Sequence, residues 1–117
     1  MARQAIKNTL SPAGTVSTPT ETFSNVINTD AGRDARIYVE LEALNGATEL
    51  DVQAQIAEVS DPTKFVAVKG VANPFTAPGR QVISLAEQEV GKFLRLRYIP
   101  DAGAPTLNAI LETKEGN

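Results

Sequence analysis

The feature that most constrains this chain is a stretch near its end in which leucine and tyrosine recur at every second position. In Lys92–Leu111, KFLRLRYIPDAGAPTLNAIL, the residues Leu94, Leu96 and Tyr98 alternate with phenylalanine, arginine and isoleucine. Successive side chains of a β-strand point to opposite faces, so this period of two predicts a strand. A second strand follows a turn rich in proline and glycine, and we expect the two strands to form a hairpin. The turn residues are Pro100, Asp101, Gly103 and Pro105.

The same alternation recurs in the middle of the chain. In Ala35–Leu44 the aliphatic residues fall on one face, while charged residues and Tyr38 fall on the other. This pattern is typical of a strand that is buried on one side. Leu50–Val59 repeats it after the dipeptide Asn45-Gly46, which tolerates the positive φ of a tight reversal. We therefore predict a second hairpin here.

Further short strands are expected wherever alternating or β-branched residues lie between turn signals. They are Phe23–Asn28, Phe65–Val71, Arg80–Leu85 and Thr106–Thr113. Between Phe65–Val71 and Arg80–Leu85, Phe75 lies in a proline-rich loop and is expected to anchor it. The resulting seven or eight short strands predict an all-β fold, with no convincing amphipathic helix. We expect a single antiparallel β-sandwich, jelly-roll-like or immunoglobulin-like, over residues 23–117.

The first 22 residues differ in composition from the rest. The segment Ser11–Thr22, SPAGTVSTPTET, is rich in serine, threonine and proline, and its prolines oppose both helix and central strand. We predict an extended N-terminal arm over residues 1–22. It is either a loose terminus or an arm that becomes ordered on a neighbouring subunit. In the second case Ile6, Leu10 and Val16 are the side chains expected to dock.

Composition excludes several classes of function. Cysteine and histidine are absent, which removes disulfides, thiolate ligands and the commonest general base near neutral pH. We therefore expect no enzyme, and no catalytic, cofactor-binding or metal-binding residue. Eleven basic residues are outnumbered by fourteen acidic ones, which argues against binding nucleic acid. No apolar run approaches the ~20 residues of a membrane span, so we expect no membrane partner and synthesis in the cytoplasm.

Arg95 and Arg97 share the polar face of the predicted strand in Lys92–Leu111. A guanidinium presents a rigid fork to a carboxylate, so the two arginines are candidate contacts with a partner chain. The alternative is pairing across strands inside the domain, for example with Glu40, Glu42 or Glu112. Tyr38, on a polar face, is the aromatic residue best placed to contact a ligand.

Three stretches of the chain resemble a family of small β-sandwich virion proteins of tailed bacteriophages. The first is LDVQAQIAEVSD (Leu50–Asp61), a strand that ends in a Ser-Asp turn. The second leads from Phe75-Thr76 into PGRQVISL (Pro78–Leu85), and the third is VGKFLRLRYIPDAGAPTLNAIL (Val90–Leu111). The likeness spans residues 37–112. The chain departs from it after the Ser-Asp turn, where similar sequences often carry glycine and tryptophan and this one has PTKF.

This resemblance implies a structural role on a virus particle. It implies a capsid decoration, or cement, protein that binds the outer capsid surface and stabilises the shell. The implied location is the virion, and the implied partners are the major capsid protein and further copies of this chain, commonly as a homotrimer. The alternative from a different class is a carbohydrate- or receptor-binding sandwich on a phage fibre, a tail or a cell surface.

Overall fold

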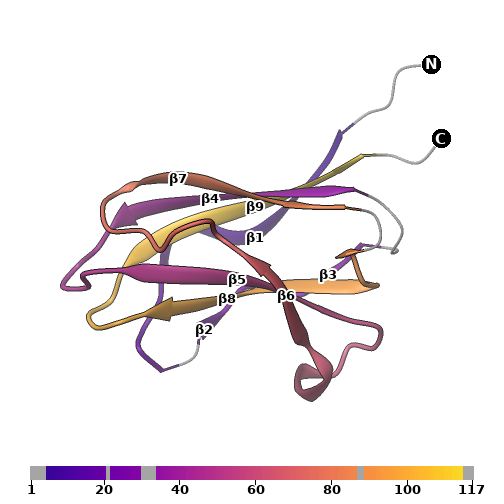
Figure 1. The fold of residues 1–117 in the computed structure, drawn as a ribbon, viewed down its shortest axis with the longest axis horizontal. Helices are drawn as coiled ribbons and strands as arrows, with labels where there is room; N and C mark the ends of the chain where they lie inside the picture. Colours follow the sequence, from indigo (N-terminus) through magenta and orange to yellow (C-terminus); the bar gives the residue numbers. More distant parts are fainter. Residues whose placement is uncertain (1–4, 21, 30–33, 87–88, 115–117) are drawn as a thin grey trace.

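The computed structural model describes residues 5–20, 22–29, 34–86 and 89–114. In these residues the chain is all-β, and its strands form two antiparallel sheets that pack face to face (Figure 1). The strands are β1 Ala5–Val16, β2 Thr22–Phe23, β3 Ile27–Asn28, β4 Ala35–Ala43, β5 Leu50–Ala57, β6 Val66–Gly70, β7 Gly79–Leu85, β8 Phe93–Pro100 and β9 Thr106–Lys114. A single 3₁₀ turn, η1 at Pro62–Lys64, lies between β5 and β6. The prediction of an antiparallel β-sandwich is confirmed.

The strand order is that of a jelly roll. One sheet has the order β1-β9-β4-β7 and the other β2-β8-β5-β6, with β3 pairing β8 beside β2. Paired residues lie at nearly equal sequence distances on either side of residue 60: Asn8 with Leu111, Phe23 with Arg97, Ile37 with Ile83, and Ile56 with Val66. The chain is thus one long antiparallel ribbon that is folded over on itself. This order supports the jelly-roll alternative over the immunoglobulin-like one.

Both predicted hairpins are wrong, although their strands are present. β4 and β5 lie in different sheets, and so do β8 and β9. Each of these connections therefore crosses from one layer to the other. Among the strands described, the consecutive pair β5 and β6 does form a hairpin, closed by η1. Alternation shows which face of a strand is buried but carries no information about which strand is its neighbour.

The faces predicted to be buried do form the core. The inward side chains of β4 and β8 are almost fully excluded from solvent, and those of β9 meet them between the sheets. They include Ile37, Val39, Leu41, Leu94, Leu96, Tyr98, Leu107 and Leu111. The expectation for Phe75 is also confirmed. Its ring is buried, and its backbone N–H and C=O bond the C=O and N–H of Leu50 at 2.8 and 2.9 Å.

The N-terminal segment contributes a strand to the sandwich. β1 pairs with β9 from Ala5 opposite Lys114 to Val16 opposite Thr106, and Leu10 is fully buried in the core. Two register shifts interrupt the pairing around Ser11. β1 is an edge strand, where a proline and irregular register are tolerated. Residues 5–16 of the predicted arm are therefore continuous with the sheet of their own chain.

Two of the crossing loops contact each other at one end of the sandwich. Asn45 C=O accepts from Ala104 N–H at 3.2 Å, and Asp101 accepts from the backbone N–H of Thr48 at 2.9 Å and from its hydroxyl. These hydrogen bonds lower the pKa of Asp101. Gly103 has φ +68°, and a Cβ there would lie 2.5 Å from the Asn45 oxygen. The loops therefore approach closely because glycine stands at this position.

Candidate interaction surfaces

Arg95 is not exposed on an open sheet face. Its side chain is only 8% exposed, and its guanidinium lies between the rings of Phe23 and Phe65, with Cζ 3.8 and 4.2 Å from the ring centroids. The Nε atom donates to Gln55 Oε1 at 2.8 Å, and an Nη atom donates to the Pro62 C=O at 3.3 Å. Burial in this way corrects the expectation that Arg95 contacts a partner chain. Pairing across strands inside the domain, the alternative interpretation, is what the structure shows, through Gln55 of β5. The carboxylates named as examples for it lie on β4 and β9 of the other sheet.

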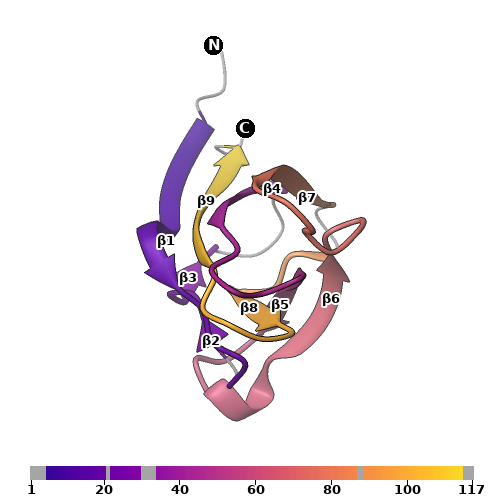
Figure 2. The same cartoon turned by 90° about the vertical axis from the view of Figure 1, so that its left-hand side faces the viewer.

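The contacts of Arg95 fix the connection between β5 and β6 against the sheet. We call residues 58–66 of this connection the braced tip. Within it, Asp61 accepts from the Thr63 N–H at 2.9 Å and from its hydroxyl at 2.8 Å, and these bonds lower the pKa of Asp61. In Figures 1 and 2 the tip forms the lower extreme of the molecule, far from the start of β1. It carries Val59 and Val66, which are 53% and 60% exposed.

The other residues predicted to form an interface are dispersed. Arg97 is half-buried on the same side of β8 as Arg95, in register with Phe23 and Gln53. Leu10 belongs to the core, whereas Val16 is exposed at the end of β1. Ile6 pairs through its backbone with Thr113, and its side chain lies outside the described part of the structure. The predicted set therefore does not form one surface.

A different surface lies on the outer side of the β1-β9-β4-β7 sheet, and we call it the outer face. At its centre Val82 of β7, Tyr38 of β4 and Ile110 of β9 stand opposite one another in register. These side chains are 50%, 38% and 39% exposed, so they form an apolar stripe across three strands. The stripe lines a shallow groove of about 450 Å³. The sequence signal for this stripe is an apolar residue on the otherwise polar side of each alternating segment. Which of these residues lie next to one another depends on the register of the strands.

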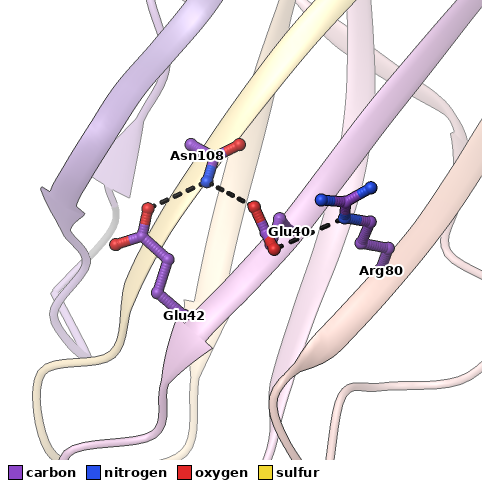
Figure 3. Close-up of polar contacts among 4 residues, drawn as sticks. All are labelled: Glu40, Glu42, Arg80 and Asn108. Carbon is purple, nitrogen blue, oxygen red and sulfur yellow. Dashed lines mark hydrogen bonds and ion pairs between the residues drawn. The ribbon is translucent and has the colours of Figure 1, made fainter.

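Polar side chains border the stripe on one side, and Figure 3 shows the polar contacts among four of them. The Asn108 Nδ2 donates to Glu40 Oε1 at 3.0 Å and to Glu42 Oε2 at 2.8 Å. Arg80 Nε donates to Glu40 Oε2 at 3.4 Å. The hydrogen bond from Asn108, and then those with Arg80, lower the pKa of Glu40. Glu42 also accepts from the backbone N–H of Gly14 at 3.1 Å, so this border is held by bonds between three strands and the β1 edge.

The other border of the stripe carries charges of both signs. Glu112 of β9 stands in register between Arg36 of β4 and Lys7 of β1. The Tyr38 hydroxyl makes a long hydrogen bond of 3.5 Å to Glu112 Oε1. Arg36 and Lys7 are both exposed. The outer face is therefore an apolar stripe between two rows of charged and amide side chains.

In the described residues no group of three acidic side chains is placed to hold a metal ion. In the part of the chain that the structure describes, no helix is long and apolar enough to cross a membrane. The groove of about 450 Å³ along the outer face is open to solvent. The geometry thus draws attention to two exposed surfaces, the braced tip and the outer face.

The fold and its surfaces define a jelly-roll β-sandwich, and solved structures share this fold. No protein-family model matches the chain, and no curated protein sequence matches it. A subunit of the disulfide-linked pili of Bacillus endospore appendages superposes with a TM-score of 0.59 and 10% identity, over 97% of this chain and 88% of that one. The SPBc2 prophage-derived protein YomS gives 0.56 and 8%, over 96% of each chain. VP2 of infectious bursal disease virus, from a subviral particle, gives 0.58 and 14%, over 96% of this chain and 33% of VP2. Likenesses at these identities establish the shared fold.

Proposed function

We propose that this protein is a structural component of a bacteriophage particle, a decoration protein that binds the outer surface of the capsid and stabilises the shell. The sequence resemblance over residues 37–112 supports this role, and the jelly-roll fold, shared with a prophage-derived protein and a viral particle protein, is compatible with it. A fold alone does not determine function. The observation that carries the proposal is the braced tip, which lies at the lower extreme of the molecule in Figure 1 and includes two valines that are more than half exposed.

The braced tip is suited to binding a larger surface. The stacked Arg95 and the capping Asp61 already hold the connection in one conformation. A preorganised loop loses less conformational entropy on binding than a mobile one, so more of the contact energy appears as affinity. Val59 and Val66 are 53% and 60% exposed and add apolar area that contact with the capsid would bury. Each contact is small, but a lattice repeats it, and linked copies gain avidity.

The test is co-sedimentation of the purified chain with capsids that lack it. We expect the double variant Val59→Asp with Val66→Asp to lose binding, while Val16→Asp, at an equally exposed valine far from the tip in sequence, binds as the wild type does. Circular dichroism must show that both variants are folded. Loss of binding in Val16→Asp alone would instead place the contact at the N-terminal strand. Failure of the wild type to bind any capsid of the virus that encodes it would refute the decoration function itself.

One observation favours a second candidate function, a carbohydrate-binding module. Tyr38 is exposed in the groove of the outer face, with amide, carboxylate and guanidinium groups around it. An aromatic surface with a few convergent polar groups is a usual composition for a small-ligand site. We expect this alternative to give binding on a glycan array that Tyr38→Ala abolishes. An array without signal for the wild-type chain would exclude it.

A further inference from the structure

We infer that the outer face is a self-complementary interface through which two copies of this chain associate face to face. The apolar stripe of Val82, Tyr38 and Ile110 is the largest feature of this face, and its side chains are half-exposed although they lie side by side on neighbouring strands. Sheets commonly bury such a face by packing against a second sheet about 10 Å away. The inference concerns self-association and holds whether or not the protein binds capsids.

The arrangement of charges identifies a second copy as the occupant. Consider a two-fold axis that lies in the interface, parallel to the strands and midway between β4 and β9. Residues in register share one height on the sheet, so this axis places β4 of each copy over β9 of the other. Tyr38 then meets Ile110 of the second copy, and Arg36 meets Glu112 of the second copy. Each contact occurs twice, as in any isologous interface.

The same operation brings compatible groups together on the other border of the stripe. Glu40 lies over Asn108 of the second copy, so no carboxylate is placed over a carboxylate within these rows. The hydrogen bonds from Asn108 and Arg80 already hold the Glu40 carboxylate in position. Over β4 and β9 the face therefore pairs apolar with apolar and positive with negative when it meets a copy of itself, while Val82 of β7 lies over Thr9 of β1 in the second copy. A partner of unrelated sequence would have to reproduce this pattern.

The size of the face sets the expected strength. The sheet has four strands about 4.8 Å apart, and the face extends over about six residues along each strand at about 3.3 Å per residue. Its area is therefore roughly 400 Å² per copy. A pair of copies would bury roughly 800 Å², which is below the ~1,200 Å² at the lower end of stable interfaces. We therefore expect a weak dimer with a dissociation constant on the order of 100 µM. Such an interface matters when copies are held close together, as in an assembly.

The experiment is analytical ultracentrifugation of the full chain from about 10 µM to about 1 mM. We expect a monomer–dimer equilibrium, weakened roughly tenfold or more by Ile110→Asp and by Arg36→Glu. Val66→Asp, on the braced tip, is the matched control and should dimerise as the wild type does. Thermal melts show that each variant is folded. A wild type that stays monomeric throughout, or that forms trimers unaffected by Ile110→Asp, would overturn the inference.

A mixture of two charge variants tests the geometry of the interface. Arg36→Glu carries two carboxylates at positions 36 and 112, and Glu112→Arg carries two guanidinium groups there. Each variant alone is expected to repel its own copy. Mixed in equal amounts, they restore both opposite-charge contacts, and we expect heterodimers with about the wild-type affinity. This rescue cannot arise from contacts inside one chain, so its absence would refute the proposed two-fold arrangement.

Discussion

The burial of Tyr98, whose hydroxyl is hydrogen-bonded to Ser11, should make the stability of this protein sensitive to alkaline pH. Ser11 belongs to β1 and Tyr98 to β8 in the opposite sheet, and their oxygen atoms are 2.7 Å apart in the core. Replacing either residue leaves the other hydroxyl buried without its partner. Such an unsatisfied group destabilises a protein by about 1–3 kcal/mol. We expect Tyr98→Phe and Ser11→Ala each to lower the free energy of unfolding by that amount at pH 7.

The sign of the pH effect follows from the burial of the phenol. Burial raises the pKa of Tyr98 from 10.0 to about 12, despite the opposing hydrogen bond to Ser11. The unfolded state therefore releases the phenolic proton first. The stabilisation linked to this pKa is complete below pH 10 and disappears as the pH rises to about 12. At 1.36 kcal/mol per pKa unit, the loss is of the order of 2–3 kcal/mol.

Urea unfolding of the wild type and Tyr98→Phe at several pH values between 7 and 12 measures this effect. The wild type should be more stable at pH 7, and its advantage should shrink above pH 10, because only its unfolded state gains from ionisation at residue 98. Tyr38→Phe is the matched control, since Tyr38 is exposed, and its stability should parallel that of the wild type. A constant difference between wild type and Tyr98→Phe across this range would refute the reasoning.

Three further predictions concern other parts of the fold. Removal of residues 2–16 should prevent folding, because β9 loses its outer neighbour and the core loses a buried leucine; a folded circular dichroism spectrum would contradict this. Gly103→Ala should lower the free energy of unfolding by about 2 kcal/mol or more, because its φ is positive and a Cβ would strike the backbone. Gly79→Ala, where a Cβ meets no atom within 4 Å, is the control and should have little effect. Asp101→Asn should reduce the loss of stability on acidification below about pH 4. In the native state the pKa of Asp101 is lowered from the ordinary value of 3.8, so stability is lost as the carboxylate takes up a proton. Equal acid sensitivity of the wild type and Asp101→Asn in urea titrations would be the contrary result.

The strands of this protein could be predicted from the sequence better than their pairing. Alternation located β4 and β8 and showed which of their side chains are buried. It also suggested that β4 and β8 each pair with the next strand, because short turns usually join paired strands. In the structure these turns instead cross the sandwich. Pairing at long sequence separation depends on the global fold, which a local pattern does not contain.

The N-terminal strand shows a second reason for failure. Pro12 and Pro19 are strong signals against a central strand, and they led to the prediction of an arm. β1 is an edge strand whose register shifts near Pro12. Proline argues against a central strand but does not argue against an edge strand. Leu10, predicted as a docking residue, is apolar enough to enter a core, and that core is the one in its own chain.

The interaction surfaces required tertiary information. Arg95 lies on the polar side of its strand, as alternation predicts, but the connection after β5 folds back and covers it. Alternation cannot distinguish an open face from one that a loop covers. Conversely, Val82 and Ile110 could each be placed on the outward side of a strand from sequence. Only the register of β7, β4 and β9 brings them to either side of Tyr38.

The nested pairing about residue 60 has a consequence for how the protein is made. Synthesis proceeds from the N-terminus, so β1 leaves the ribosome first, yet its partner β9 is the last strand to emerge. The β5–β6 hairpin closes the shortest loop and should form first, followed by pairs of increasing sequence separation. β1 therefore waits as an unpaired strand, with Leu10 exposed, until almost the whole chain has been released. Its irregular, proline-containing edge is of a kind that resists association with other strands during that interval.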